Sequence, residues 1–202
     1  MCGIIGFIGR DKCIPKIIHG LEALEYRGYD SAGIAYFKDG KIETIKEEGK
    51  IANLKKLLNF NEDAYNGIGH TRWATHGEAN KTNAHPHTVG KFTIVHNGII
   101  ENYSELKNEL INKGYKFKSA TDTEVACATF DDIYKEEKDI LKTLHIASQK
   151  FRGSYAFGIL CSDDISTLYA MRNTSPLIVA SAAYGNFIAS DVPAILEFTN
   201  KY

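Results

Sequence analysis

Cys2 is the residue of this chain whose position most suggests chemistry, because only Met1 precedes it. If Met1 is removed, the chain starts with a cysteine that carries both a thiol and a free α-amino group. An α-amine has a pKa of about 8 and a thiol of about 8.5, so the amine can accept the thiol proton close to neutral pH. Position alone leaves two interpretations open: a self-activated nucleophile, or a small buried residue at the start of a strand.

Asn97 and Gly98 follow the apolar residues 92–95 and also have two interpretations. Asn-Gly is a common turn pair. A side-chain amide beside an unhindered backbone N–H can also stabilise an oxyanion, and each such donor contributes about 3 kcal/mol in the transition state.

Two other polar segments contain charged side chains that we expect in loops, where functional residues concentrate. Arg27 and Asp30 lie within residues 25–33, where they either pair with each other or act directly. Arg72 precedes Trp73, the single tryptophan of the chain. The guanidinium of Arg72 is a rigid fork that suits a carboxylate.

Four histidines raise the question of a zinc site: His70, His76, His85 and His87. Their spacing matches neither a helix-borne His-Glu-x-x-His motif nor a closed Cys/His site. We therefore expect no metal and no other cofactor. The histidines are expected to order loops through hydrogen bonds, with one or two lining a pocket.

The elements that must position these groups are a mixture of strands and helices. Strands are expected at residues 3–9, 32–37, 41–47, 92–95, 154–161, 167–171, 177–180 and 186–189. Helices are expected at residues 15–24, 51–58, 103–111, 125–134, 140–151 and 193–198. Asn102 with Glu105, and Thr121 with Glu124, have the spacing of capping boxes. Strands group at both ends of the chain, which favours an α+β layered architecture over a doubly wound parallel sheet.

Composition bounds the class of protein. A chain of 202 residues with 44% hydrophobic content supports one domain with a sizeable core. The formal net charge of -1 gives no reason to expect nucleic acid or an acidic membrane surface as a partner. No apolar stretch reaches the length of a membrane span, and no secretory signal is visible, so we expect a cytoplasmic protein with reduced thiols.

Six segments together resemble the glutaminase domain of the glucosamine-6-phosphate synthases, a family of class II glutamine amidotransferases in the N-terminal-nucleophile hydrolase superfamily. These segments are residues 2–6, 25–33, 70–77, 83–87, 96–102 and 121–124. Other class II amidotransferases share the Cys-Gly-Ile start but differ at residues 73–76 and 83–87. The resemblance covers essentially residues 1–202 and implies a four-layer αββα sandwich.

The resemblance also implies roles for the residues of the reaction. Cys2 would attack the side-chain amide of L-glutamine, with its own α-amine as general base. Asn97 and Gly98 would hold the oxyanion. Arg72 would bind the α-carboxylate of glutamine and Asp122 its α-ammonium, although an acidic residue in a first helical turn is also favourable without any function.

Supporting roles follow from the same resemblance. The loop of residues 72–77 would close over the substrate, with Trp73 in the lid and Thr75 and His76 in the pocket. His85 would lie at the pocket edge, and Arg27 would orient the chain terminus.

The resemblance further implies two partners in the full enzyme, which we expect to be a homo-oligomer: glutamine, and a sugar-isomerase domain that receives ammonia and converts fructose 6-phosphate to glucosamine 6-phosphate. That domain is absent from these residues, and the abrupt end suggests that a final strand or linker of the glutaminase domain is missing. Three alternatives stay open: a glutamine-binding module without turnover if Met1 is retained, the glutaminase domain of another class II amidotransferase, and a zinc-binding interaction domain.

Overall fold

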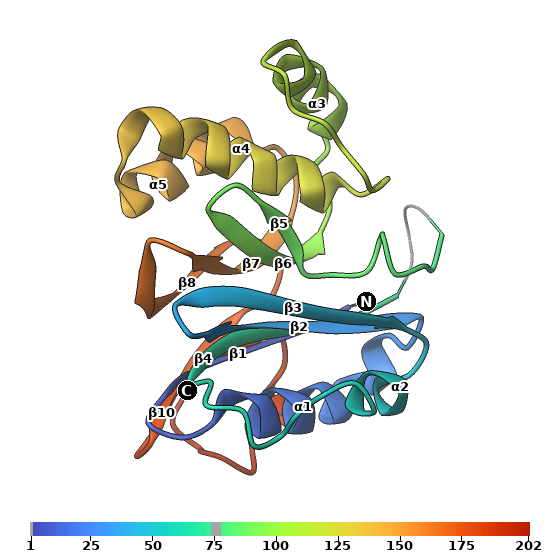
Figure 1. The fold of residues 1–202 in the computed structure, drawn as a ribbon, viewed down its shortest axis with the longest axis vertical. Helices are drawn as coiled ribbons and strands as arrows, with labels where there is room; N and C mark the ends of the chain where they lie inside the picture. The colour runs from blue at the N-terminus through green and yellow to red at the C-terminus, as the bar shows by residue number, and fades with distance from the viewer. Residues whose placement is uncertain (1, 74–77) are drawn as a thin grey trace.

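The computed structural model describes residues 2–73 and 78–202, and in it two antiparallel sheets lie face to face with helices on both outer faces (Figure 1). The layers are therefore helix, sheet, sheet and helix, which is the αββα sandwich that the family resemblance implies and is consistent with the α+β prediction. Thr75 and His76, two of the predicted pocket residues, lie outside the described residues.

The first sheet has six strands in the order β3-β2-β4-β1-β10-β9, with β1 and β4 at its centre. Its strands are β1 (Gly3–Gly9), β2 (Ser31–Lys38), β3 (Lys41–Glu48), β4 (Asn66–Arg72), β9 (Ile178–Ala182) and β10 (Gly185–Ala189). Helices α1 (Cys13–Ala23) and α2 (Ile51–Lys55) cover its outer face (Figure 1). A core that includes Phe7, Ile17 and Phe187 fills the space between these helices and the sheet.

The second sheet has four strands in the order β5-β6-β7-β8. Its strands are β5 (His87–Val89), β6 (Phe92–Gly98), β7 (Tyr155–Cys161) and β8 (Asp164–Asn173), and the helices beside it are α3 (Tyr103–Asn112), α4 (Asp122–Glu137) and α5 (Ile140–Lys150). Phe92, Phe130 and Phe157 form the aromatic part of the core under α4 and α5.

A third apolar cluster joins the two sheets. Ile4, Val95 and Ile188 belong to it, whereas Ile5, the neighbour of Ile4, faces the helices instead. Alternate side chains of a strand point to opposite faces of its sheet, so strands buried on both faces have apolar residues at consecutive positions. This explains why residues 3–9 are continuously apolar.

Strand β4 was not predicted, and it carries two of the functional candidates. Its sequence, Asn-Gly-Ile-Gly-His-Thr-Arg, is polar and rich in glycine, yet all seven residues are buried. The glycines are explained by close packing, because a side chain at Gly69 would overlap Ile17 of α1. His70 and Arg72 therefore lie on a rigid central strand and not in a loop. The short strand β5 was also missed.

Most of the other predicted elements are confirmed, with errors at the ends. The hairpin between β2 and β3 turns at Asp39 and Gly40, which both have positive φ (48° and 73°), as Asp-Gly hairpin turns require. Helix α2 ends at Lys55, shorter than expected. The predicted helix at residues 193–198 is only a 3₁₀ turn, η2 (Val192–Ala194), and a second such turn, η1 (Glu25–Arg27), follows α1.

The two predicted capping boxes differ. Thr121 caps α4, since its hydroxyl accepts a hydrogen bond from the backbone N–H of Glu124 (3.3 Å). Asn102 does not cap α3 with its side chain, and that prediction was wrong. Its amide is used elsewhere: it accepts from the N–H of Arg152 and donates to the carbonyl of Lys150, which ties α3 to the end of α5.

Within the described residues, no helix combines the length and the apolarity that crossing a bilayer would need.

Candidate functional site

A small pocket lies where the start of β1, the end of β4, the end of β6 and the start of α4 meet. Its volume is about 40 Å³, which is room for a few water molecules. The residues that line it are Cys2, Arg72, Trp73, His85, His96, Gly98, Thr121, Asp122 and Thr123. Six of the predicted site residues thus converge here, although as many as 120 positions separate them in the sequence.

The Cys2 thiol is held at the mouth of this pocket, next to the first residue of β1. The backbone N–H of Trp73 donates a hydrogen bond to Sγ at 3.2 Å. Burial raises the pKa of the Cys2 thiol, while the Trp73 N–H and the charges of Arg72 and Arg27 act in the opposite direction. The thiol therefore needs a base for activation. Once the thiolate has formed, the Trp73 N–H and the two arginine side chains stabilise it.

The carbonyl oxygen of Cys2 accepts two side-chain hydrogen bonds that fix the residue. Arg27 Nε donates at 3.1 Å and Asn97 Nδ2 at 2.9 Å. Arg27 is itself held by Asp191, whose carboxylate lies 2.6 Å from Nη1 and also accepts from the hydroxyl of Tyr26. This geometry supports the predicted role of Arg27 as a residue that orients the start of the chain.

Asn97 and Gly98 are the last two residues of β6. Gly98 lines the pocket, whereas Asn97 does not line it and instead contacts the backbone oxygen of Cys2. Oδ1 of the Asn97 side chain lies 3.0 Å from Nε2 of His70. Gly98 has φ 115°, and any side chain there would overlap the carbonyl of Ser154. Glycine is therefore required here by the positive φ and by the close approach of Ser154.

Arg72 and Asp122 bring opposite charges to the pocket from different layers. Arg72 ends β4 and is 4% exposed, and its Nη1 donates a hydrogen bond to the carbonyl of Glu78 (3.2 Å). Burial lowers the pKa of the Arg72 guanidinium, and the negative charges of Asp30 and Asp122 oppose that shift. Asp122 begins α4, and its Oδ2 accepts from the N–H of Ile100 at 2.9 Å. A cation and an anion fixed at one pocket suit an amino-acid zwitterion.

Buried histidines pack beneath the pocket. The rings of His70 and His85 are 4.1 Å apart, and His85 Nδ1 accepts from the N–H of His96 at 3.4 Å. Burial lowers the pKa of His70 and of His87 to about 3, and that of His85 well below its usual value, so these rings are neutral. They order the site through hydrogen bonds and ring contacts, as expected.

The zinc alternative finds no candidate in residues 2–73 and 78–202, where no group of three or more His, Cys, Asp or Glu side chains is placed to hold a metal ion. His76 lies outside those residues.

Sequence reasoning missed several residues of the site. His96, Thr121 and Thr123 line the pocket, and no pocket role was predicted for them: all three lie inside the recognised motifs, and Thr121 was expected only to cap a helix. Asp191 supports Arg27 from 164 positions away, and nothing in the local sequence indicated the pair. The donor to the thiol is the backbone of Trp73, a contact that its side-chain type cannot predict.

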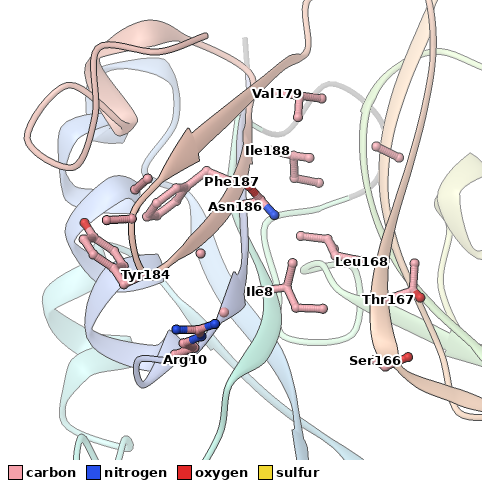
Figure 2. Close-up of a pocket in the computed structure, with 15 residues that line it drawn as sticks. Ile8, Arg10, Ser166, Thr167, Leu168, Val179, Tyr184, Asn186, Phe187 and Ile188 are labelled. Carbon is pink, nitrogen blue, oxygen red and sulfur yellow. The ribbon is translucent and has the colours of Figure 1, made fainter.

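A much larger hollow of about 700 Å³ lies at the opposite end of β1, between β8 and the hairpin of β9 and β10 (Figure 2). We call it the β8–β10 groove. Its lining residues are Ile8, Gly9, Arg10, Ser166, Thr167, Leu168, Ala170, Val179, Ala182, Ala183, Tyr184, Gly185, Asn186, Phe187 and Ile188. None of the predicted site residues is among them, so cavity size does not indicate the functional site here.

The chain is similar to known proteins over most or all of its length. Residues 70–197 match the family model described as "Glutamine amidotransferase domain". Two curated relatives carry the name glutamine–fructose-6-phosphate aminotransferase (isomerizing). The protein of Clostridium perfringens is 51% identical and that of Pyrococcus horikoshii 50% identical, each over 100% of this chain. The chain spans about a third of the length of these relatives (33% and 34%).

Solved structures show the same fold. The glutamine phosphoribosylpyrophosphate amidotransferase of B. subtilis, complexed with ADP and GMP, superposes with a TM-score of 0.82 at 25% identity, covering 96% of this chain and 43% of that one. A glutamine aminotransferase class-II domain protein of Silicibacter pomeroyi gives 0.58 at 13% identity, covering 94% of this chain and 88% of that one, and supports the fold alone. The two antiparallel sheets between helical layers are thus the N-terminal-nucleophile hydrolase fold. The family model covers most of the chain, and the two relatives are about 50% identical to it over its full length. The chain therefore belongs to the glutamine amidotransferase domain family.

Proposed function

We propose that this chain, residues 1–202, is a glutaminase domain that hydrolyses the side-chain amide of glutamine to glutamate and ammonia. The observation that carries the proposal is the convergence, at one pocket, of the Cys2 thiol, Gly98 and the charge pair of Arg72 and Asp122, with the Asn97 amide bonded to the Cys2 backbone beside that pocket. Each has an ordinary structural explanation alone. Together they supply a nucleophile, an oxyanion site and a clamp for an amino acid.

The clamp selects the substrate. The Arg72 guanidinium binds the α-carboxylate of glutamine and the Asp122 carboxylate its α-ammonium. Charged hydrogen bonds of this kind contribute about 1.5 to 3 kcal/mol each. Two fixed charges of opposite sign orient a zwitterion, and the side-chain amide then extends toward Cys2.

The pocket must widen to admit glutamine, since its present volume is about 40 Å³. Trp73 is 44% exposed, and the ring contact that its indole makes within the described residues is a T-shaped one with Tyr29. Its indole is therefore placed to move as part of the lid. Thr75 and His76 are proposed for the same loop by sequence, and His85 for the pocket wall.

The nucleophile is activated by its own α-amine, which becomes free when Met1 is removed. The amine takes the thiol proton, and Sγ attacks the amide carbon of glutamine. The oxyanion that forms is stabilised by Asn97 Nδ2 and the Gly98 N–H. The amine gives the proton to the side-chain amide nitrogen of glutamine, which leaves as ammonia. A γ-glutamyl thioester remains on Cys2. Water, deprotonated by the same amine, then breaks the thioester and releases glutamate.

The wider setting is a proposal drawn from the relatives. Because the chain spans about a third of proteins named glutamine–fructose-6-phosphate aminotransferase, we place it as the ammonia-producing part of such an enzyme. The ammonia would pass to a sugar-isomerase domain that converts fructose 6-phosphate to glucosamine 6-phosphate, in a homo-oligomeric enzyme. The four cysteines are free thiols, which fits the cytoplasm.

Glutamate release from glutamine by the wild-type chain and two variants tests the proposal. Cys2→Ala is expected to abolish turnover. Cys13→Ala is the matched control, because Cys13 is buried in α1 and outside the site. Unchanged turnover in Cys2→Ala would refute the mechanism. The mass of the mature N-terminus is measured on the same samples: glutamine binding without turnover, on a chain that retains Met1, would indicate a binding module instead.

A further inference from the structure

His70 is fully buried at the centre of β4 and does not line the pocket. Its Nε2 lies 3.0 Å from two atoms of β6, the backbone oxygen of His96 and Oδ1 of Asn97. These contacts join β4 of the first sheet to the end of β6 in the second.

The backbone oxygens of Cys2 and His96 can only accept hydrogen bonds, and this fixes which atoms donate around Asn97 and His70. The oxygen of Cys2 faces the Asn97 side chain at 2.9 Å, so the atom that faces it must be the amide nitrogen. Oδ1 of Asn97 then faces His70. The oxygen of His96 faces the same ring nitrogen of His70, so Nε2 must carry a proton and donate to both oxygens.

Burial keeps the imidazole neutral, because it lowers the pKa of His70 to about 3. With the single ring proton on Nε2, Nδ1 is an acceptor, and within the described residues it has no hydrogen-bond partner. The ring therefore gives its only N–H to the β6 strand. A rotation of the Asn97 amide by half a turn would place its NH₂ against that N–H and its oxygen against the Cys2 carbonyl, which loses both hydrogen bonds.

We propose that His70 is a positioning residue that locks the Asn97 amide with its nitrogen toward Cys2, so that the oxyanion donor is set before glutamine binds. The inference rests on the proposed glutaminase function. A donor fixed in advance needs no reorganisation during the reaction, which is the source of its effect on rate. His70 touches neither the substrate nor the reacting atoms.

The test compares His70→Leu, which removes the donor, with His70→Gln, whose amide nitrogen can donate from a similar position. In steady-state glutamine hydrolysis, His70→Leu is expected to lower kcat about 10- to 100-fold with KM changed by less than about threefold. His70→Gln is expected to recover most of kcat. Thermal unfolding of each variant shows whether it is folded, and alkylation of Cys2 by iodoacetamide, which needs the thiol but no oxyanion site, should proceed at the wild-type rate.

A double-mutant cycle separates positioning from a general structural role. In an Asn97→Ala background, His70→Leu should have no further effect on kcat, since the group that it orients is gone. An equal loss with and without Asn97 would overturn the proposal, as would a folded His70→Gln variant as slow as His70→Leu.

A second measurement needs no activity and so distinguishes failure of this inference from failure of the proposed function. The ¹⁵N chemical shifts of the His70 ring report its tautomer in the resting protein. A protonated Nε2 and an unprotonated Nδ1 are expected, with faster hydrogen exchange of the Asn97 amide in His70→Leu. A protonated Nδ1 would overturn the inference, whereas absence of glutamate release by the wild-type chain would count against the proposed function alone.

Discussion

The two ends of β1 differ in almost every property that could identify a functional site. Before Gly3 the pocket is small, about 40 Å³, and holds converging charged and hydrogen-bonding groups. Beyond Ile8 the β8–β10 groove is about 700 Å³ and open, with residues such as Leu168, Val179 and Ile188 in its lining (Figure 2). The contrast teaches that here the convergence of chemistry, and not the room available, marks the site.

Strand β1 runs from the pocket to the groove, and packing on both of its faces fixes its position. Ile5 and Phe7 hold β1 to the helical layer, and Ile4 holds it to the second sheet. Cys2 is thereby placed at the edge where β4 and β6 also end.

The largest effect is expected from the oxyanion donor at the pocket end. Asn97→Ala should lower kcat for glutamine hydrolysis by about 10²- to 10³-fold, since one donor to the transition state is lost. KM should change little, because glutamine is held by its α-substituents. A variant with normal kcat would show that the Asn97 contact with Cys2 is structural only.

The second effect concerns the clamp. Arg72→Lys keeps the charge but loses the fork, and KM for glutamine is expected to rise about tenfold or more. A glutamine analogue without the α-carboxylate provides the control, because the variant should discriminate against it less than the wild type does. If both proteins favour glutamine over the analogue by the same ratio, Arg72 does not bind the carboxylate.

A smaller effect is expected on stability, and it too separates the two ends. His70, His85, His87 and His96 are buried near the pocket with lowered pKa values, whereas the groove lining contains no histidine. Their folded pKa values lie below the unfolded value of about 6.5, so the unfolded state binds more protons as the pH falls.

The contribution of these neutral histidines to the free energy of unfolding should therefore be complete above about pH 6.5. The free energy of unfolding should decrease from there toward pH 4.5, before most carboxylates titrate. Urea denaturation at several pH values measures this decrease. A free energy that stays constant across the window would mean that the histidines are not buried as neutral rings.

The smallest effect is expected at the groove. Val179 lines it and is 65% exposed, so Val179→Thr, a change of nearly equal shape, should leave kcat and KM within about twofold of the wild type. A larger loss of glutaminase activity would show that the groove communicates with the pocket and would weaken the contrast drawn above.

Much of this architecture follows from local patterns in the sequence. The apolar run of β1, the Asp-Gly turn after β2 and the Thr121 cap are local signals, and all three are confirmed. Strand β4 could not be predicted from its sequence, because its residues do not form an apolar alternation. Its glycines allow close packing against α1, and its polar residues belong to the site. Its burial is decided by the neighbouring strands β1 and β2.

The site divides in the same way. Cys2, Arg72, Asn97 and Asp122 could be named from their motifs, but the contacts between them depend on tertiary structure. The support of Arg27 by Asp191 and of Asn97 by His70 arises from pairs that are 164 and 27 positions apart. No spacing rule links such residues, because tertiary structure sets their distance. Arg27 and Asp191 flank different strands of the first sheet, and His70 and Asn97 lie on strands of opposite sheets.

The central claim is that Cys2 carries the glutamyl group during turnover. The most direct test is mass spectrometry of acid-quenched protein after mixing with glutamine, with peptide mapping to locate any adduct. The account predicts one glutamyl group on the peptide that contains Cys2. This adduct should be absent from Cys2→Ala, and hydroxylamine should remove it, because hydroxylamine cleaves thioesters. Turnover by a protein on which Cys2 never becomes acylated, or an adduct at another residue, would contradict the account.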